Sequence, residues 1–502
     1  MNLLHSINRL LQSIERAGNK LPHPTVLFIY LCGLILLLSA IASWFGVSAI
    51  HPVNNDMITA SNLLSTEGLH RILNETVSNF VTFAPVGTVL VAIMGIGVAE
   101  QSGLIRAVLQ ACVLKAPPRT ITFVVVLAGV LSSLAADTGY VVLIPLAALI
   151  FQAAGRHPIA GIAAAFAGVS GGFSANLLIG PIDAILAGLS TEAAQLVNST
   201  YEVSAAGNYY FMLASTLLIS LTGTWVTERL VIPRLPKVEA QVTEEAVLGS
   251  QERRGLKAVL LFTLAFVALL IACTVPENGI LRDPQTHSLL KSPFMRGIVT
   301  VIAVYAALAG LVFMKASKAL DANRFVEGME SSMATMASYL VLMFFAAQFV
   351  SYFNWSQLGI ITAIHGADWL KAQQLSQSVL LISFVLMAAL INLLIGSASA
   401  KWALIAPIFV PMFYLLGISP EATQVAYRIG DSTTNIITPL MPYFGVVVAF
   451  VQRYDKTAGI GTMVATMLPY SLALLSAWLL LLAAWLLMGW PLGPGAESLL
   501  SS

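Results

Sequence analysis

The chain has 502 residues, of which 58% are hydrophobic and only 10% are charged, and its net charge is +1. A soluble domain carries roughly 25% charged residues, so this composition excludes an ordinary soluble protein and indicates one that lies in a membrane. The near-neutral charge gives no support for nucleic-acid binding. Three cysteines without paired spacing give none for a disulfide framework or a metal site. We therefore expect an all-α polytopic membrane protein.

Apolar runs of about 18 or more residues recur along the chain and predict membrane-spanning helices. The predicted spans are 26–46, 84–100, 158–189, 209–232, 258–275, 297–314, 329–350, 422–451 and 458–489. Two further apolar stretches, 120–154 and 376–416, are too long for one ordinary span, and each has a polar middle. The number of spans depends on whether each stretch crosses the membrane or returns to the side from which it entered.

The basic residues indicate that both stretches are re-entrant hairpins. Lys115 and Arg119 precede the first stretch and Arg156 follows it, and Lys and Arg accumulate in cytoplasmic loops. Treating both stretches as hairpins places 18 of the 25 Lys and Arg residues on one side, whereas eleven full spans would put Arg156 outside. The sequence therefore predicts nine transmembrane helices plus two re-entrant hairpins, with a cytoplasmic N-terminus.

A repeat with a spacing of 262 residues relates the two hairpin regions. Positions 131–170 and 393–432 align without a gap and share 10 of 40 residues. The informative matches are Pro145 with Pro407, Phe151 with Phe413, Gly155 with Gly417, Pro158 with Pro420, Gly168 with Gly430 and Ser170 with Ser432. Since the first hairpin opens from the cytoplasm and the second from outside, we predict an inverted-topology repeat, an arrangement typical of secondary transporters.

The predicted organisation follows this repeat. Its segments are a cytoplasmic N-terminal segment (1–25), scaffold helices (26–119), a first repeat unit with hairpin and broken helix (120–208), a scaffold helix (209–234), a cytoplasmic linker (235–257), more scaffold helices (258–375), a second repeat unit with hairpin and broken helix (376–456), and a C-terminal helix with its tail (457–502). External loops are expected at 47–75, 190–208, 276–296 and 351–375.

Four polar segments interrupt the apolar runs of the repeats: the tips 132–139 and 396–402, and the helix breaks 168–176 and 430–439. Non-helical backbone at membrane depth survives where it lines a cavity or is buried in protein, and such oxygen-rich segments hold Na⁺ in transporters. The Na⁺ candidates are Ser133, Asp137, Ser170, Asn176, Ser397, Ser399, Ser432 and Asn435. The alternative is that Gly and Ser only allow close helix packing.

Ionisable residues within the bilayer are functional candidates by default. Asp431 follows Arg428 by three residues, a spacing that predicts an ion pair on one helix face, which would be functional or merely self-neutralising. Asp183 has no basic neighbour at helical spacing, so it is either a proton carrier or a solvated residue near the external interface. Lys401 either snorkels to the interface or compensates a nearby carboxylate. Trp402, matched by Tyr140 in the repeat, stacks on an aromatic substrate or packs in the core.

With these residues in view, the chain resembles the AbgT family of p-aminobenzoyl-glutamate transporters over essentially its whole length. The resemblance is carried by GNKLPHPTVLFIY (18–30), NFVTFAPVGTVL (79–90), GRHPIAG (155–161), GVSGGFSANLL (168–178), QFVSYFNWS (348–356), WALIAPIFVPMF (402–413), AYRIGDSTTNIITPL (426–440) and GWPLGPG (489–495). Motifs of this length and order are highly specific.

The resemblance implies a homodimer of nine-helix protomers with two hairpins, in the bacterial inner membrane. It implies uptake of p-aminobenzoyl-glutamate or efflux of sulfonamide antimetabolites, coupled to H⁺ or Na⁺ and without another cofactor. Family residues linked to transport match Asp183, Asn392, Trp402, Pro420, Arg428 and Asp431. The expected partners are a small-molecule substrate, membrane lipid and a second copy of the chain, and the protein is not expected to be an enzyme.

Three other functions are compatible with parts of the pattern. A sodium-coupled dicarboxylate carrier also uses paired hairpins with polar tips, although the aromatic Trp402 argues against it. An intramembrane aspartyl protease would use Asp183 and Asp431, but Arg428 stands where the first glycine of its Gly-x-Gly-Asp pattern belongs. A passive channel would not need two symmetric helix breaks.

Overall fold

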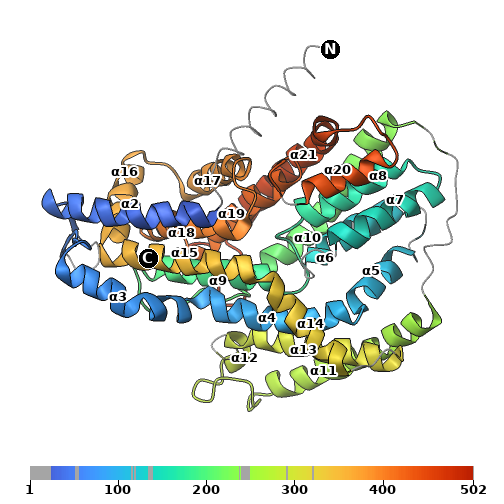
Figure 1. Cartoon of the computed structure of the whole chain (residues 1–502), viewed down its shortest axis with the longest axis horizontal. Coiled ribbons are helices and arrows are strands. Elements are labelled where there is room, and N and C mark those ends of the chain that lie inside the picture. Colours follow the sequence, from blue (N-terminus) through green and yellow to red (C-terminus); the bar gives the residue numbers. More distant parts are fainter. Residues whose placement is uncertain are drawn as a thin grey trace, which may run out of the picture.

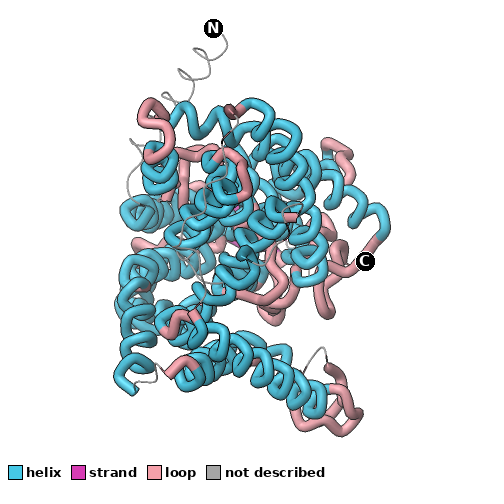
Figure 2. Tube along the Cα trace, turned by 90° about the vertical axis from the view of Figure 1, so that its right-hand side faces the viewer, coloured by secondary structure: helices cyan, strands magenta, loops and turns pink. Residues whose placement is uncertain are grey.

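The computed structural model describes residues 24–50, 56–114, 117, 120–133, 139–236, 238, 249–289, 292–318, 322–441 and 443–500. Helices and their connecting loops make up almost all of this part of the chain (Figures 1 and 2). Among the described residues, β1 (Ser48–Ile50) and β2 (Met57–Thr59) form one small antiparallel sheet, in which Ala49 lies opposite Ile58. The predicted all-α class is confirmed.

The helices fall into those outside and those inside the two repeats. Outside the repeats lie α2 (Pro24–Trp44), α3 (Thr66–Val81), α4 (Ala84–Gln101), α5 (Leu104–Leu114), α10 (Tyr209–Val226) with η4 (Thr227–Val231) and η5 (Ile232–Arg234), α11 (Ser250–Thr274), α12 (Pro293–Arg296), α13 (Ile298–Ala316), α14 (Ala322–Thr335), α15 (Ala337–Trp355), α16 (Leu358–Ala372) and α21 (Ile460–Met488). The first repeat holds α6 (Ile121–Ser132), η2 (Gly139–Leu143), α7 (Ile144–Ala153), α8 (Pro158–Phe166), η3 (Ala167–Gly171) and α9 (Pro181–Ala194). The second holds α17 (Gln377–Asn392), α18 (Ala398–Tyr414), α19 (Pro420–Asn435) and α20 (Phe444–Gln452).

Seven of the described helical segments are long and apolar enough to cross a membrane, which confirms a polytopic protein. The helices of both predicted hairpins are shorter, except that α16 and α17 together pass the same test with a bend of 118° between them. The count of nine spans stays a prediction.

Several predicted boundaries were wrong. The loop expected at 351–375 contains helix α16, and the loop at 47–75 contains the β-hairpin and the start of α3. The span 329–350 is divided between α14 and α15, with Met336 as the N-terminal cap of α15. Hydropathy averages over a window, so it does not detect a short break or a helix that lies outside the apolar runs.

The break in the second repeat also lies later than predicted. Helix α19 continues without interruption to Asn435, so Asp431 and Ser432 lie on its last turns and not in a break. In the first repeat the helix becomes a π-turn at 167–171 and the chain is non-helical from 172 to 180. The two breaks are therefore similar in place but differ in the backbone that precedes them.

The repeated breaker residues have the same structural roles in both halves. Gly155 ends α7 with a φ of 70° and Gly417 ends α18 with a φ of 77°, the left-handed conformation that glycine adopts without strain. Helices α8 and α19 then begin with Pro158 and Pro420 at their first position. The shared Pro and Gly thus set matching turns between the hairpin and the helix that follows it.

Gly168 and Gly430 allow close helix contacts, as the packing alternative predicted. A Cβ at Gly168 would lie 2.3 Å from the Val126 carbonyl oxygen of α6, and a Cβ at Gly430 would lie 2.4 Å from the Val385 carbonyl oxygen of α17. Each glycine therefore brings its helix against the first helix of its own hairpin.

Candidate functional site

Helix α19 is the centre of the candidate site because every one of its sixteen residues is buried. A helix buried on all sides is normally apolar all round, whereas α19 carries charged, amide and hydroxyl side chains. Buried polar groups need hydrogen-bond partners, so the partners of α19 show which other elements belong to the site. They come from both repeats.

An ion pair between the repeats joins α19 to α9. The Nη2 atom of Arg428 lies 2.6 Å from Oδ1 of Asp183, and Nη1 of Arg428 donates to the Ser174 carbonyl oxygen at 3.2 Å. The other carboxylate oxygen of Asp183 accepts from the Gly180 amide at 2.7 Å, which caps the start of α9. The sequence shows no basic neighbour of Asp183 at helical spacing, and its partner Arg428 is instead distant in the chain.

A second buried ion pair lies within the second repeat. The Lys401 ammonium on α18 contacts Oδ1 of Asp431, and the lysine side chain is completely buried. The predicted pair of Arg428 with Asp431 was therefore wrong: both residues lie on α19, but each has its partner on another helix. Of the two alternatives for Lys401, the structure supports compensation of a carboxylate and excludes snorkelling.

Asn392 connects the end of α17 to the last turns of α19. Its side-chain nitrogen donates to the Asp431 carbonyl oxygen at 2.6 Å and to Thr434 Oγ1 at 2.8 Å. Its carbonyl oxygen accepts a hydrogen bond from Lys401. Asn392 thus links α17 to α18 and α19, the two helices that carry the second ion pair.

Trp402 packs in the core instead of offering a free aromatic face. Its ring stacks on Tyr427 with centroids 4.6 Å apart, and its Nε1 donates to Ser190 Oγ on α9 at 3.0 Å. The repeat-related Tyr140 stacks on Tyr443 with centroids 4.5 Å apart. In this conformation the packing alternative describes both rings.

The Na⁺ candidates make hydrogen bonds in both repeats, and the Ser174 amide, which donates to Ser432, connects the two. In the first, Asn176 donates to Ser133 Oγ at 2.8 Å, and the buried Ser170 Oγ has no hydrogen-bond partner among the described residues. In the second, Ser432 Oγ accepts from the Ser174 amide at 3.2 Å, and Asn435 Oδ1 accepts from Asn392 at 2.9 Å. Ser397 caps α18 and lies 3.4 Å from Ser399, and Asp137 lies outside the described residues.

Sequence reasoning missed two members of the site, Gln424 and Tyr427. The Gln424 amide lies 2.7 Å from Ser190 Oγ and, with its carbonyl oxygen toward Arg428, accepts from Arg428 Nη2 at 3.3 Å. The Tyr427 hydroxyl donates to Asp431 Oδ1 at 3.4 Å. The spacing of Gln424, Tyr427, Arg428 and Asp431 by three and four residues places them on one helix face, a signal present in the sequence.

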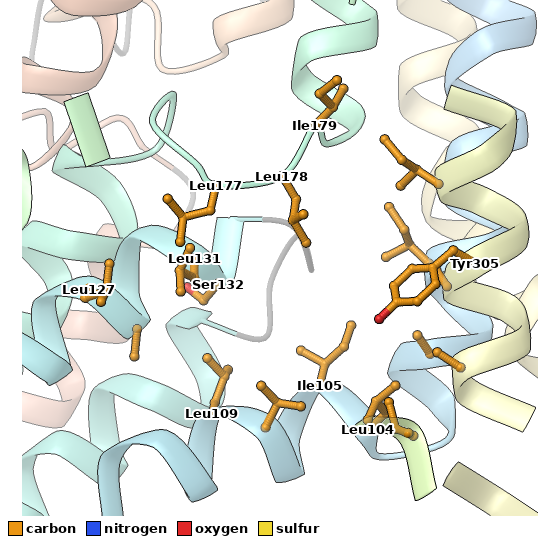
Figure 3. A pocket seen from close by; sticks show the side chains of 18 of the residues that line it. Leu104, Ile105, Leu109, Leu127, Leu131, Ser132, Leu177, Leu178, Ile179 and Tyr305 are labelled. Atoms are coloured by element: carbon orange, nitrogen blue, oxygen red, sulfur yellow. The ribbon is translucent and has the colours of Figure 1, made fainter. Parts of the chain in front are cut away.

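A small crevice adjoins Asp183, and a larger apolar cavity lies next to the crevice. A crevice of 10 Å³, about the volume that holds one water, is lined by Asp183, Asn176 and Tyr209 among others. Leu178 and Ile179 separate it from an apolar cavity of 520 Å³ between the first repeat and α4, α5, α11 and α13. Figure 3 shows Leu178 and Ile105 pointing into this cavity, together with Tyr305.

A family model for the AbgT transporter family matches residues 9–500. The chain belongs to the AbgT family. This assignment agrees with the polytopic fold, the paired hairpin regions and a buried polar helix, and it makes the protein a transporter and not an enzyme.

Three relatives support the AbgT assignment. The p-aminobenzoyl-glutamate transport protein of Escherichia coli (strain K12) is 39% identical over 490 residues, covering 97% of this chain and 96% of the relative. The YdaH transporter of Alcanivorax borkumensis, whose crystal structure is described as having an unusual topology, is 52% identical with a TM-score of 0.91, covering 94% of this chain and all of that chain. MtrF of Neisseria gonorrhoeae, described as illuminating a class of antimetabolite efflux pumps, is 47% identical with a TM-score of 0.92, covering 97% of this chain and all of that chain.

Proposed function

We propose that this protein is a secondary active transporter of p-aminobenzoyl-glutamate and related aryl-amine antimetabolites, including sulfonamides that it exports. The observation that carries the proposal is the ion pair of Arg428 with Asp183 between the two repeats. The full-length similarity to a p-aminobenzoyl-glutamate transport protein supports the substrate, and the similarity to MtrF supports efflux.

In the proposed cycle a carboxylate of the substrate replaces Asp183 at the guanidinium of Arg428. Arginine binds carboxylates through two parallel N–H groups, so one anion exchanges for another without leaving a buried charge unpaired. Asp183 is the most exposed of the four charged side chains, 12% against 0–1% for the others, and it borders the crevice. When a substrate carboxylate displaces it, Asp183 takes up a proton through the crevice, so that this substrate and H⁺ move together and an inward proton gradient drives uptake.

The apolar cavity receives the aromatic ring in this proposal. Its volume of 520 Å³ lies within the range of drug-sized ligand sites. The hydroxyl of Tyr305 at its wall is hydrogen-bonded to Thr263 Oγ1 at 2.8 Å, so the wall presents mainly apolar surface. A sulfonamide keeps the arylamine ring without the glutamate, and a site that holds the ring in an apolar cavity accepts both substrates.

In the proposed transport cycle, the two repeats move relative to the remaining helices. We propose that the protein is a homodimer in the bacterial inner membrane and that its N-termini are cytoplasmic. Helix α11 supports contact with lipid or a second copy, because Leu260, Leu261 and Leu264 are each more than 60% exposed. Such a row of leucines is favourable in hydrocarbon or against another apolar helix.

The test is flux of radiolabelled p-aminobenzoyl-glutamate in proteoliposomes, with proton and sodium gradients imposed separately. Flux that follows the proton gradient and is inhibited by sulfonamide supports the proposal, whereas flux that follows the sodium gradient contradicts coupling through a proton on Asp183. Absence of flux with folded protein, together with uptake of succinate, would favour the dicarboxylate carrier instead.

A further inference from the structure

The surroundings of Lys401 in the second repeat are those of a bound cation. Its ammonium group contacts Oδ1 of Asp431 and donates to Oδ1 of Asn392, two oxygens supplied by different helices. The side chain has no exposed surface, and Asp431 is 1% exposed. An ammonium is a compact charge with three donors, so it satisfies a set of converging oxygens much as a small metal ion does.

One carboxylate oxygen beside Lys401 receives no hydrogen bond from the described residues. The second carboxylate oxygen of Asp431, Oδ2, is buried and has no hydrogen-bond partner among the described residues. The neighbouring hydroxyl of Thr434 accepts from Asn392 at 2.8 Å, and the Tyr427 hydroxyl lies 3.4 Å from Asp431 Oδ1. The cage formed by the side-chain oxygens of Asn392 and Asp431 thus keeps one acceptor without a donor and carries one negative charge.

We propose that the Lys401 ammonium is a tethered cation that fills this cage in place of Na⁺. Helices α17 and α19 of the second repeat supply the oxygens of the cage, and Lys401 of α18 brings its charge on a covalent side chain. A charge held in this way neutralises Asp431 but is not transported. Sodium therefore has no room beside the Asp431 carboxylate.

The proposal rests on the proposed function as a coupled carrier and specifies its ion. Asp431 is neutralised by Lys401, whereas Asp183 is freed when its partner Arg428 is exchanged for substrate, so we assign coupling to Asp183. The first repeat supplies no second cage of this type, because the positions matching Asn392, Lys401 and Asp431 are Val130, Gly139 and Val169. Transport is then driven by H⁺ through the first repeat.

The experiment compares ²²Na⁺ binding by purified full-length wild type, Lys401→Ala and Lys401→Met. In Lys401→Ala the cage is vacated and Asp431 is left without its cation, so we expect saturable binding of about one additional Na⁺ per chain. In Lys401→Met, the matched control, an apolar side chain of similar length keeps the cage filled, and we expect wild-type binding. Lys401→Ala that binds no more Na⁺ than wild type would overturn the proposal.

A second measurement needs no altered lysine and no substrate. The unfolding midpoint of the wild type is compared in sodium chloride and in choline chloride at equal concentration. A ligand at 100 times its Kd would raise the midpoint by about 3 °C or more, and we expect no such Na⁺-specific rise. A rise that Asn392→Ala abolishes would place Na⁺ in the cage and overturn the proposal. Both readouts measure ion binding, so a carrier with a different substrate leaves them interpretable.

Discussion

The two repeats place nearly identical turns around two helices of opposite character. Helices α8 and α19 both begin at a matched proline, after His157 and Ser419 respectively, whose side chains accept from the first turn. The residues that follow are PIAGIAAAFAGVSG in the first repeat and PEATQVAYRIGDST in the second. Phe166 and Val169 occupy the positions of Arg428 and Asp431.

This difference shows that the repeat determines backbone geometry and not chemistry. The shared proline and glycine residues act on φ and on helix separation, which are needed equally in both halves. The charges are needed once, because an ion pair between the repeats requires one arginine and one carboxylate. Burial of an unpaired charge in both halves would destabilise the protein.

The largest effect is expected for Arg428→Met. The substitution leaves Asp183 without its cation and removes the group proposed to bind the substrate carboxylate. We expect flux to fall at least 100-fold and the free energy of unfolding to fall by about 3–5 kcal/mol, the cost of breaking a buried pair. The control is Phe166→Leu at the matching position of the first repeat, which should retain flux. Wild-type flux in Arg428→Met would contradict the proposed role.

Asp183→Asn should separate coupling from binding. The amide still accepts from Arg428 but cannot exchange a proton, so we expect flux to lose its dependence on an imposed proton gradient and to fall about tenfold or more. Flux is measured in proteoliposomes with and without the gradient, after the protein is shown to be folded. Unchanged rates in both Asp183→Asn and Asp431→Asn would show that neither carboxylate takes part in transport.

Gly168→Ala and Gly430→Ala test whether the repeats are packed alike. In each variant the new Cβ meets a backbone carbonyl oxygen, of Val126 or of Val385, at less than 2.5 Å. We expect both variants to lose about 1–3 kcal/mol of unfolding free energy through overpacking, read from the unfolding midpoint. Gly459→Ala, where no heavy atom lies within 4 Å, is the control. A loss confined to one glycine would show that the two contacts are not equivalent.

The smallest effect is expected for a substitution of His157, the N-terminal cap of α8. Burial lowers the pKa of His157 from its usual 6.5, with Asp455 opposing the shift, and its Nδ1 accepts from the Ile159 amide. The neutral ring is therefore favoured in the folded protein, so this contribution is present above pH 6.5 and is lost as the pH falls toward the lower folded-state value. His157→Ser should remove this part of the acid sensitivity, measured as the unfolding midpoint between pH 5 and pH 7. An identical pH profile in His157→Ser and wild type would exclude the histidine as its source.

The sequence by itself determined where the chain is apolar, where it turns and which residues are repeated. Apolar runs act through the hydration of their own side chains, and the repeated turn residues act through their own φ angles. These are Gly155 with Gly417 and Pro158 with Pro420. Because these effects are local, they can be predicted from the sequence without knowledge of the fold. For the same reason the motifs of the AbgT family were recognisable from the order of the residues. The buried charges of the second half were recognisable as candidates.

Only the tertiary structure decided how those charges pair. Spacing on α19 suggested Arg428 with Asp431, but Arg428 contacts Asp183 of the other repeat and Asp431 contacts Lys401 of α18. Neighbours on one helix compete with any group that another helix brings closer, and which group that is depends on packing across the whole molecule. The sequence predicted the polar face of α19 but not the residues on other helices that pair with it.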